Sequence, residues 1–377
     1  MSKQQKVLNK IKHTLNSGLT TPLGTKPNDE CYTSMKDILD ELSKWGALGK
    51  FKGKRIICPC DWDITDDSDV YQINIEYDCC KNALTSSMSD NVKSIVYKKF
   101  DLSKLLNDEV VETVHSISVK PEEVDEFLRN KLTCNFVRTL TQNAKEWGIK
   151  SITASGFNPN TNEGIKFQDV DYSKYDICIT NPPFSLYGEF MKCIVGKIDF
   201  ICLAPFLNRV SPNVGLPLML KQAYLGFNVY IGLNFYNPTS KNDYKTKSVA
   251  CDWITSFDDA QLERNKEFKN HKSGVSIHDY ASDYIEYPLV TMKDGSHPIR
   301  VPATQIPDDY NGWMFTSINV LHLISFDDYI WYISNAKGYF NKLNPDDNPF
   351  VHKATNDMWM VNGKKTFHGV LLKRITK

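Results

Sequence analysis

The sequence predicts an α/β fold, in which a doubly wound, mostly parallel sheet carries helices on both faces. Two observations predict it. Short apolar runs that suit buried strands alternate with amphipathic helical stretches over about 200 residues, the pattern of a parallel sheet. One of these runs, residues 175–180, stops at two consecutive prolines. In open sheets of this class, ligands bind at the carboxyl ends of the strands.

The first helix is expected at residues 34–45, where apolar residues recur at helical spacing and Ser34 can cap the amino end. The first strand, residues 54–58, runs into a polar turn. A helix at 134–147 ends before Gly148, which suits the left-handed position after a helix. The remaining helices are expected at residues 187–195 and 216–224, and the remaining strands at 149–154, 199–205, 227–235 and 249–257.

Residues 64–131 are interpreted as an insertion between the first strand and its helix. Residues 70–77 alternate in polarity and are expected to form a strand that pairs with residues 94–100. Residues 119–131 are typical of a charged surface helix. A structural elaboration explains the insertion at least as well as a functional role.

The chain changes character near residue 258. The preceding part, residues 1–257, contains all the predicted sheet strands and is expected to form the first domain. Residues 258–377 have polar helical turns, frequent Asp, Asn and Pro breaks, and many aromatic residues. We therefore expect an α+β appendage that packs on the sheet, and no repeat of fixed period is present.

Composition excludes several classes of protein. The 377 residues include 45 basic and 45 acidic side chains, so no overall field attracts nucleic acid, and such binding needs a local basic face. No apolar run is long enough to span a membrane, and a cytoplasmic protein is expected. The ten cysteines show no paired Cys-x-x-Cys spacing, so reduced thiols and no bound metal are expected.

The stretch Asn181-Pro182-Pro183-Phe184 follows the strand at 175–180 and suits one chemical task, holding a planar amino group. The Asn181 side-chain oxygen and the Pro182 carbonyl can both accept hydrogen bonds from an NH2 group. The prolines stiffen the backbone, and Phe184 offers a ring on which a base can stack. Two fixed acceptors favour rehybridisation of the amino nitrogen toward a nucleophile. The competing interpretation is a simple proline turn after a strand.

These features together resemble the class I S-adenosylmethionine-dependent methyltransferases, which have a Rossmann-like fold. More narrowly, the chain is similar to the EcoRI-like adenine-specific DNA methyltransferases. The similarity covers most of the chain outside the insertion, and its motifs are Asp29-Glu30-Cys31-Tyr32-Thr33, Cys58-Pro59-Cys60-Asp61, Cys134-Asn135-Phe136-Val137-Arg138, Thr153-Ala154-Ser155-Gly156-Phe157-Asn158, Asn181-Pro182-Pro183-Phe184-Ser185, Cys251-Asp252-Trp253, Ile306-Pro307-Asp308-Asp309-Tyr310-Asn311-Gly312 and Asn362-Gly363-Lys364-Lys365.

The resemblance implies a role for each matching residue. Asn181, Pro182 and Phe184 would bind and orient an adenine flipped out of duplex DNA, with Pro183 stiffening the turn. The residues implied in holding the methyl donor are Asp29, Tyr32, Thr33, Pro59, Cys60, Asp61, Asn158 and either Asp169 or Asp171. Residues 1–257 would then be the catalytic domain and residues 258–377 the part that recognises DNA.

Two departures from the wider class concern the donor site. The turn after the first strand contains no glycine, although a glycine-rich loop is common there. The second strand ends in Ser155-Gly156-Phe157-Asn158, without the carboxylate that usually binds the ribose, and Asn158 is the candidate substitute.

On the DNA side, Lys241, Lys245 and Lys247 precede the last sheet strand and are candidate phosphate contacts, although a solvated charged face is the commoner explanation. A cognate restriction endonuclease would act separately, and the oligomeric state stays open. Two alternatives remain. The enzyme could methylate cytosine N4, adenine in RNA or protein glutamine, or the chain could be a catalytically silent DNA-binding subunit.

Overall fold

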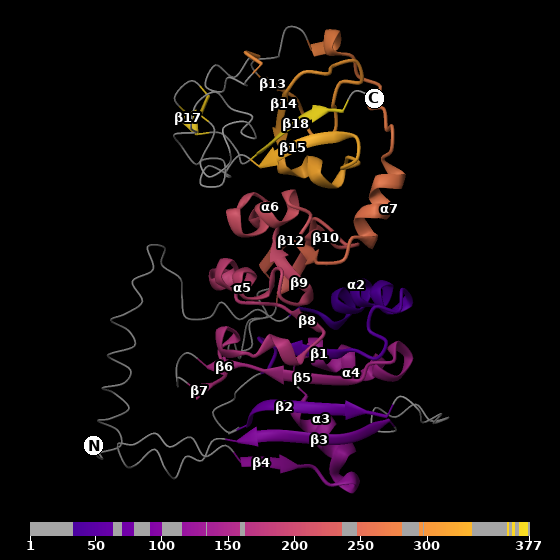
Figure 1. Ribbon diagram of the computed structural model, residues 1–377, viewed down its shortest axis with the longest axis vertical. Coiled ribbons are helices and arrows are strands. Elements are labelled where there is room, and N and C mark those ends of the chain that lie inside the picture. Colours follow the sequence, from indigo (N-terminus) through magenta and orange to yellow (C-terminus); the bar gives the residue numbers. More distant parts are fainter. Residues whose placement is uncertain are drawn as a thin grey trace, which may run out of the picture.

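The computed structural model describes residues 33–62, 70–78, 91–99, 115–132, 134–158, 163–235, 247–280, 294–296, 298–333, 360–361, 364–365 and 369–375. Most of this part of the chain is organised around one large sheet, whose strands follow each other along the long axis of the molecule (Figure 1).

The large sheet has ten strands in the order β10-β12-β9-β8-β1-β5-β2-β3-β4, with β11 also paired to β12. Its centre is parallel, because β1 pairs in parallel with both β5 and β8, and β8 pairs in parallel with β9. These four strands are Arg55–Cys58 (β1), Ser151–Ser155 (β5), Ile177–Thr180 (β8) and Asp199–Pro205 (β9). The predicted α/β class and the parallel centre of its large sheet are therefore confirmed. The outer strand pairs of this sheet are antiparallel.

Helices cover both faces of this parallel centre, as the alternation of side chains along the strands requires. Ile56 of β1 belongs to the core shared with α2 (Met35–Ala47) and α4 (Asn135–Trp147). Its neighbour Ile57 belongs to the core on the other side. That second core contains residues of α5 (Tyr187–Ile194) and α6 (Pro212–Met219). Successive residues of one strand thus pack against two different helical layers.

The insertion extends the sheet at the β5 edge. Strand β2 (Val70–Tyr77) pairs antiparallel with β5 and with β3 (Val92–Lys99), which confirms the expected pairing. Strand β4 (His115–Ser118) follows at the outer edge, and α3 (Val124–Lys131) packs nearby with Val124 and Leu128 in the core. Together they place the insertion at the end of the sheet opposite the C-terminal residues (Figure 1).

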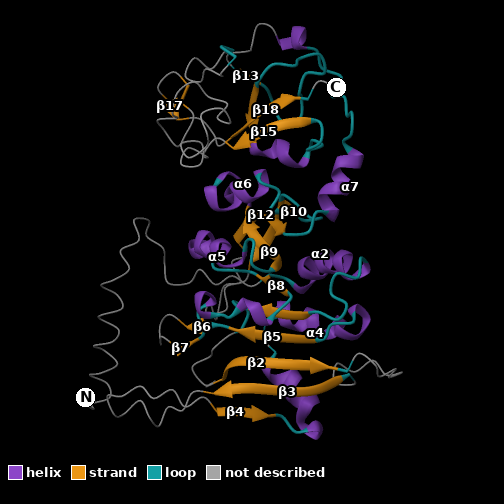
Figure 2. Cartoon of the chain, viewed as in Figure 1, coloured by secondary structure: helices purple, strands orange, loops and turns teal. Residues whose placement is uncertain are grey.

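The other edge of the sheet is also antiparallel. The last long strand, β12 (Lys247–Thr255), pairs with β9 on one side and with β10 (Tyr224–Leu225) and β11 (Ile231–Phe235) on the other. Helix α7 (Asp259–Glu267) then leads toward the C-terminal part of the chain (Figure 2).

The C-terminal part contains a second, four-stranded sheet in the order β13-β14-β18-β15. Its strands are Ile299–Arg300 (β13), Met314–Ser317 (β14), Tyr329–Ile333 (β15) and Gly369–Arg374 (β18). Short strands β16 (Met360–Val361) and β17 (Lys364–Lys365) pair with each other. A 3-10 turn, η8 (Ile318–His322), lies between β14 and β15. Across the described residues, no helix is both long and apolar enough to cross a bilayer.

Two predicted elements were placed wrongly. The helix expected at 216–224 is α6, which begins at Pro212 and ends at Met219, because proline is favoured in a first helical turn and Lys221 has a φ of +56°. The strand expected at 227–235 begins only at Ile231. The N–H groups of Phe227 and Asn228 donate instead to the buried carboxylate of Glu41.

Candidate active site

The candidate site lies where the order of the strands reverses. Chain order runs from β1 to β5 on one side of β1 and from β8 to β9 on its other side, so the switch point falls between β1 and β8. In open α/β sheets, the crevice outside the carboxyl ends of the strands at such a point is the usual ligand site. The two predicted turns, residues 59–62 after β1 and residues 181–184 after β8, both start here.

The Asn-Pro-Pro-Phe turn ends β8 and starts the next helix. All four residues of β8 are buried, and the prolines stop the ladder because they have no N–H to donate. The Pro183 carbonyl accepts a hydrogen bond from the Leu186 N–H at 3.0 Å, which closes the 3-10 turn η5 (Phe184–Leu186) ahead of α5. Phe184 is half-buried and packs against the core around Trp45, so the scaffold supports one part of its ring.

Asn181 is oriented by a residue from a distant part of the chain. Its Nδ2 donates to Oγ1 of Thr33 at 3.4 Å. Thr33 is 3% exposed, and its carbonyl accepts a hydrogen bond from Nδ2 of Asn135 at 2.8 Å. The nitrogen end of the Asn181 amide therefore faces Thr33, and the oxygen end is the acceptor that a substrate amino group would use.

The turn after β1 contributes a buried carboxylate. Asp61 is 6% exposed, and its Oδ1 accepts a bond from Sγ of Cys134 at 3.7 Å. Cys134 is the N-cap of α4, whose positive end favours a negative charge. Burial, and secondarily the Asp61 charge, raises the pKa of the Cys58 thiol well above its ordinary value. Cys58 is thus a neutral packing residue rather than a reactive thiolate.

The end of β5 touches the same turn. A Cβ at Gly156 would lie 1.9 Å from the carbonyl oxygen of Trp62, a distance that no side chain tolerates. Glycine is therefore required for the close approach of the second strand to the turn after β1. The approach brings Ser155, Gly156 and Asp61 to one rim of the crevice.

The predicted acidic residues near β8 lie on the surface. Asp169 ends the 3-10 turn η3 (Phe167–Asp169) and is exposed. The exposed Asp171 carboxylate accepts from the Ser173 hydroxyl at 2.6 Å and pairs with Lys174 at 3.3 Å. These bonds, the Ser173 hydroxyl first, lower the pKa of Asp171. The Asp171 carboxylate therefore interacts with its near neighbours Ser173 and Lys174.

The remaining predicted residues fall partly outside the described chain. Asp29, Tyr32, Lys241 and Lys245 lie outside the described residues. Asn158 is in β6 (Phe157–Asn158), and Lys247 begins β12, where it pairs with Phe235. Of the donor-site predictions, the structure brings Thr33, Pro59, Cys60 and Asp61 to the switch point with Asn181. In the described ranges, no group of three His, Cys, Asp or Glu side chains could hold a metal ion.

Sequence reasoning missed two supports of the site. Cys134 and Asn135 bind Asp61 and Thr33. Both residues lie in the Cys134–Arg138 motif at the start of the expected helix, but the resemblance implied no role for them. Arg209, in the 3-10 turn η6 (Phe206–Val210) after β9, pairs with Asp252 of β12 at 2.5 Å, and both side chains are 0% exposed. The two partners are 43 positions apart in the chain, so no local sequence pattern indicates the pair.

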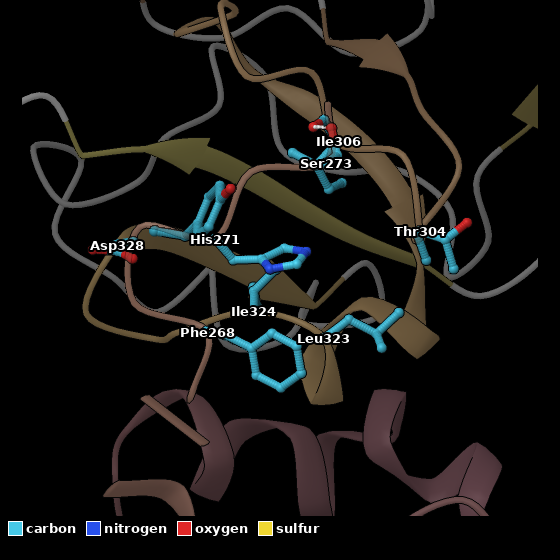
Figure 3. Close-up of a pocket in the computed structure, with 10 residues that line it drawn as sticks. Phe268, His271, Ser273, Thr304, Ile306, Leu323, Ile324 and Asp328 are labelled. Carbon is cyan, nitrogen blue, oxygen red and sulfur yellow. Dashed lines mark hydrogen bonds between the residues drawn. The ribbon is translucent and has the colours of Figure 1, made fainter. Parts of the chain in front are cut away.

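A cavity of about 220 Å³ lies elsewhere, in the C-terminal part (Figure 3). It is lined by Phe268, His271, Ser273, Ala303, Thr304, Ile306, Leu323, Ile324, Asp328 and Tyr329. The Ser273 hydroxyl donates to the Ile306 carbonyl at 2.7 Å, which closes one wall. No lining residue comes from the ends of β1 or β8, so this cavity is separate from the candidate active site.

A parallel centre that ends in an Asn-Pro-Pro-Phe turn at its switch point defines a class of protein, the methyltransferases of amino groups. The family described as adenine-specific methyltransferase EcoRI matches residues 24–375. The chain belongs to this family and is an enzyme, an adenine-specific methyltransferase, which confirms the resemblance seen in the sequence.

Two curated proteins are similar to the chain. The Type II methyltransferase M.EcoRI of Escherichia coli is 24% identical over 312 residues, which cover 78% of this chain and 82% of that protein. The Type II methyltransferase M.MgeORF184P of Mycoplasma genitalium is 23% identical over 219 residues, which cover 53% of this chain and 64% of that protein.

Proposed function

We propose that the protein transfers a methyl group from S-adenosylmethionine to N6 of an adenine flipped out of a specific duplex DNA sequence. It would serve a restriction-modification system, or an orphan or viral modification system, in the cytoplasm. The observation that carries the proposal is the position of Asn181 at the end of β8, with its amide held by Thr33 at the switch point. The similar Type II methyltransferases support the same substrate class.

The part of the chain that contains each sheet has its own role in the proposed function. Residues 1–257, with a Rossmann-like class I methyltransferase fold, would bind the donor and the adenine. Residues 258–377 would form an appendage that recognises the DNA sequence. Helix α7 lies between them in the chain, and its Arg264 donates to the Gly226 carbonyl at 2.7 Å, which ties the helix to the large sheet.

In the proposed mechanism, the adenine amino group donates one hydrogen bond to Oδ1 of Asn181 and one to the Pro182 carbonyl. Both acceptors are fixed by the rigid turn before the substrate arrives, so they stabilise the positive charge that develops on the nitrogen. Phe184 stacks on the adenine ring and holds it edge-on to these acceptors. No strong base is needed, since the proton leaves after the nitrogen has become cationic.

The donor fits the residues of the crevice. A buried carboxylate at Asp61 suits a hydroxyl or ammonium group, and the Thr33 hydroxyl and the Pro59-Cys60 turn lie beside it. S-adenosylmethionine supplies an electrophilic methyl group when bound. Thr33 and Asp61 would hold the donor on the β1 side, and Asn181 would hold the adenine on the β8 side. The further candidates are Asp29, Tyr32, Asn158 and Asp169 or Asp171.

Duplex DNA hides the adenine amino group, so the base must leave the stack. Unstacking and unpairing the base costs a few kcal/mol of free energy. Contacts to phosphates must offset this cost. The zero net charge of the chain means that local basic groups supply them, and Lys241, Lys245 and Lys247 are the proposed set.

The deciding experiment incubates the protein with plasmid DNA and radiolabelled S-adenosylmethionine, then separates the nucleosides. Labelled N6-methyladenine is the expected product. Label in N4-methylcytosine, RNA or protein glutamine would change the substrate while keeping the site. No transfer, together with no donor binding by calorimetry, would refute the proposal and favour a silent DNA-binding subunit.

A further inference from the structure

Tyr230 has an unusual backbone conformation for an aromatic residue. Its φ is +52°, and the other non-glycine residues with positive φ in the described ranges are Lys221 and Asn270. For a bulky side chain, this region is a true outlier that carries a free-energy cost and is found mostly at functional sites. The surrounding structure must therefore hold Tyr230 in place.

A buried ion pair holds the backbone of Tyr230. Its N–H donates to Oδ1 of Asp252 at 2.8 Å. The same carboxylate accepts two bonds from Arg209, each at 2.5 Å. Arg209 in turn contacts Nδ1 of His322 at 3.0 Å and the Ile318 carbonyl at 3.4 Å, both in η8 of the C-terminal part. The anchor of Tyr230 thus spans three elements.

Two rings hold the side chain of Tyr230. Its ring stacks on His322 with centroids 5.9 Å apart and an angle of 14° between the planes. On another side, Phe206 lies 4.6 Å away at 60°. Burial lowers the pKa of His322 to about 4, helped by the charges of Arg209 and Arg264, so the imidazole is neutral at neutral pH. One face of the Tyr230 ring therefore stacks on a neutral imidazole, and Phe206 contacts the ring at an angle.

Tyr230 is nevertheless 50% exposed. A buried anchor and two ring contacts thus hold Tyr230 in a strained backbone conformation, although its side chain gains little stabilisation from burial. The polar group of this half-exposed side chain is the phenol hydroxyl, which can donate and accept hydrogen bonds. The arrangement presents one hydroxyl at a fixed point on the surface.

The position of Tyr230 relates this hydroxyl to the candidate active site. Asp252 of β12 pairs with Ala204 of β9, and Ile231 pairs with Cys251, so Tyr230 is level with Asp252. The register of β8 with β9 continues to place Pro182 level with Ala204. Three strand spacings of about 4.8 Å put Tyr230 about 14 Å from Pro182 along this row.

We propose that Tyr230 is a DNA-positioning residue, whose hydroxyl donates a hydrogen bond to an acceptor on the duplex near the target adenine. The inference rests on the proposed function and adds a contact that the sequence did not indicate. A phosphate oxygen and a base edge offer the same acceptor chemistry, and the experiment separates them.

The test uses Tyr230→Phe in the full-length protein, which removes the hydroxyl and keeps the ring between His322 and Phe206. Plasmid methylation first maps the target, and a short duplex that carries it then serves as the probe. We expect a loss of about tenfold in DNA affinity and in kcat/KM, and unchanged donor binding by calorimetry. Tyr224→Phe is the matched control, because the Tyr224 hydroxyl donates to the Lys221 carbonyl of its own loop at 3.0 Å.

Each outcome has a distinct meaning. An equal loss on target and non-target duplexes identifies a phosphate contact, with an unchanged salt dependence because the hydroxyl carries no charge, whereas a loss confined to the target identifies a base edge. If Tyr230→Phe binds and methylates the duplex as the wild type does, the inference is wrong and the proposed function stands. If the wild type neither binds nor methylates duplex DNA, both are wrong.

Discussion

Replacing Asp252 with alanine should remove a large part of the stability of the fold. Arg209 is fully buried, and its guanidinium would lose both bonds to the carboxylate. Removing one partner of a buried ion pair costs about 3–5 kcal/mol, because the remaining charge is left without compensation. The Tyr230 N–H would also lose its acceptor, which adds about 1 kcal/mol.

Arg209 would keep its contacts with the Ile318 carbonyl at 3.4 Å and with Nδ1 of His322 at 3.0 Å, but neither partner carries a negative charge, so they offset little of this loss. We therefore expect a decrease of about 4–6 kcal/mol in the free energy of unfolding, a substantial share of the 5–15 kcal/mol or so typical of a folded protein. Urea denaturation followed by tryptophan fluorescence would measure it, since Trp253 is the buried neighbour of Asp252.

The matched control is the double variant Arg209→Met with Asp252→Leu, which removes both charges together. It should be more stable than Asp252→Ala by at least about 2 kcal/mol, because no buried charge remains unpaired. An Asp252→Ala variant whose free energy of unfolding lies within about 1 kcal/mol of the wild type would contradict this role of the ion pair. A double variant as unstable as Asp252→Ala would contradict it as well.

Four further changes test the site. Asn181→Ala should lower kcat by about 100-fold or more through loss of one acceptor, with donor binding by calorimetry little changed; near-normal turnover would exclude the mechanism. Phe184→Ala should mainly weaken adenine capture, measured as a higher KM for DNA. An unchanged KM would show that Phe184 does not stack on the adenine. Gly156→Ala should destabilise the fold by about 1–3 kcal/mol in urea, because its Cβ meets the Trp62 carbonyl; wild-type stability would show that the turn can move aside. His322→Asn should flatten the pH dependence of stability between pH 6.5 and about 4. The pKa of His322 is depressed in the folded state, so the stability that the neutral imidazole contributes is present above pH 6.5 and is lost as the pH falls through about 4. The loss is about 1–2 kcal/mol after allowance for the partial exposure of the side chain. Parallel profiles for variant and wild type would contradict this.

The parts of the fold that could be predicted depend on local patterns. The strand before Asn181 is an unbroken apolar run stopped by two prolines, and both signals lie within ten residues. Its place at the carboxyl edge follows from general rules for parallel sheets. Strand pairing within the insertion was also predictable, since β2 and β3 alternate in polarity and follow each other in the chain.

The parts that could not be predicted depend on contacts between distant residues. Glu41 of α2 accepts the N–H groups of Phe227 and Asn228, and so delays the start of β11. The apolar residues before Ile231 alone therefore predict a strand that begins too early in the chain. The Arg209–Asp252 pair and the Thr33–Asn181 contact likewise join segments that share no pattern, and 148 residues separate the second pair.

The origin of the site residues has a practical consequence. Thr33 and Asp61 precede the insertion in the chain, whereas Asn135 and Asn181 follow it, and the parallel pairing of β1 with β5 and β8 joins the two groups. A chain divided between β1 and α4 would give two fragments, each with only half of the crevice. Methylation would then require both fragments to associate in the correct register. The site could thus serve as a built-in reporter of fragment complementation, with enzymatic turnover as its signal.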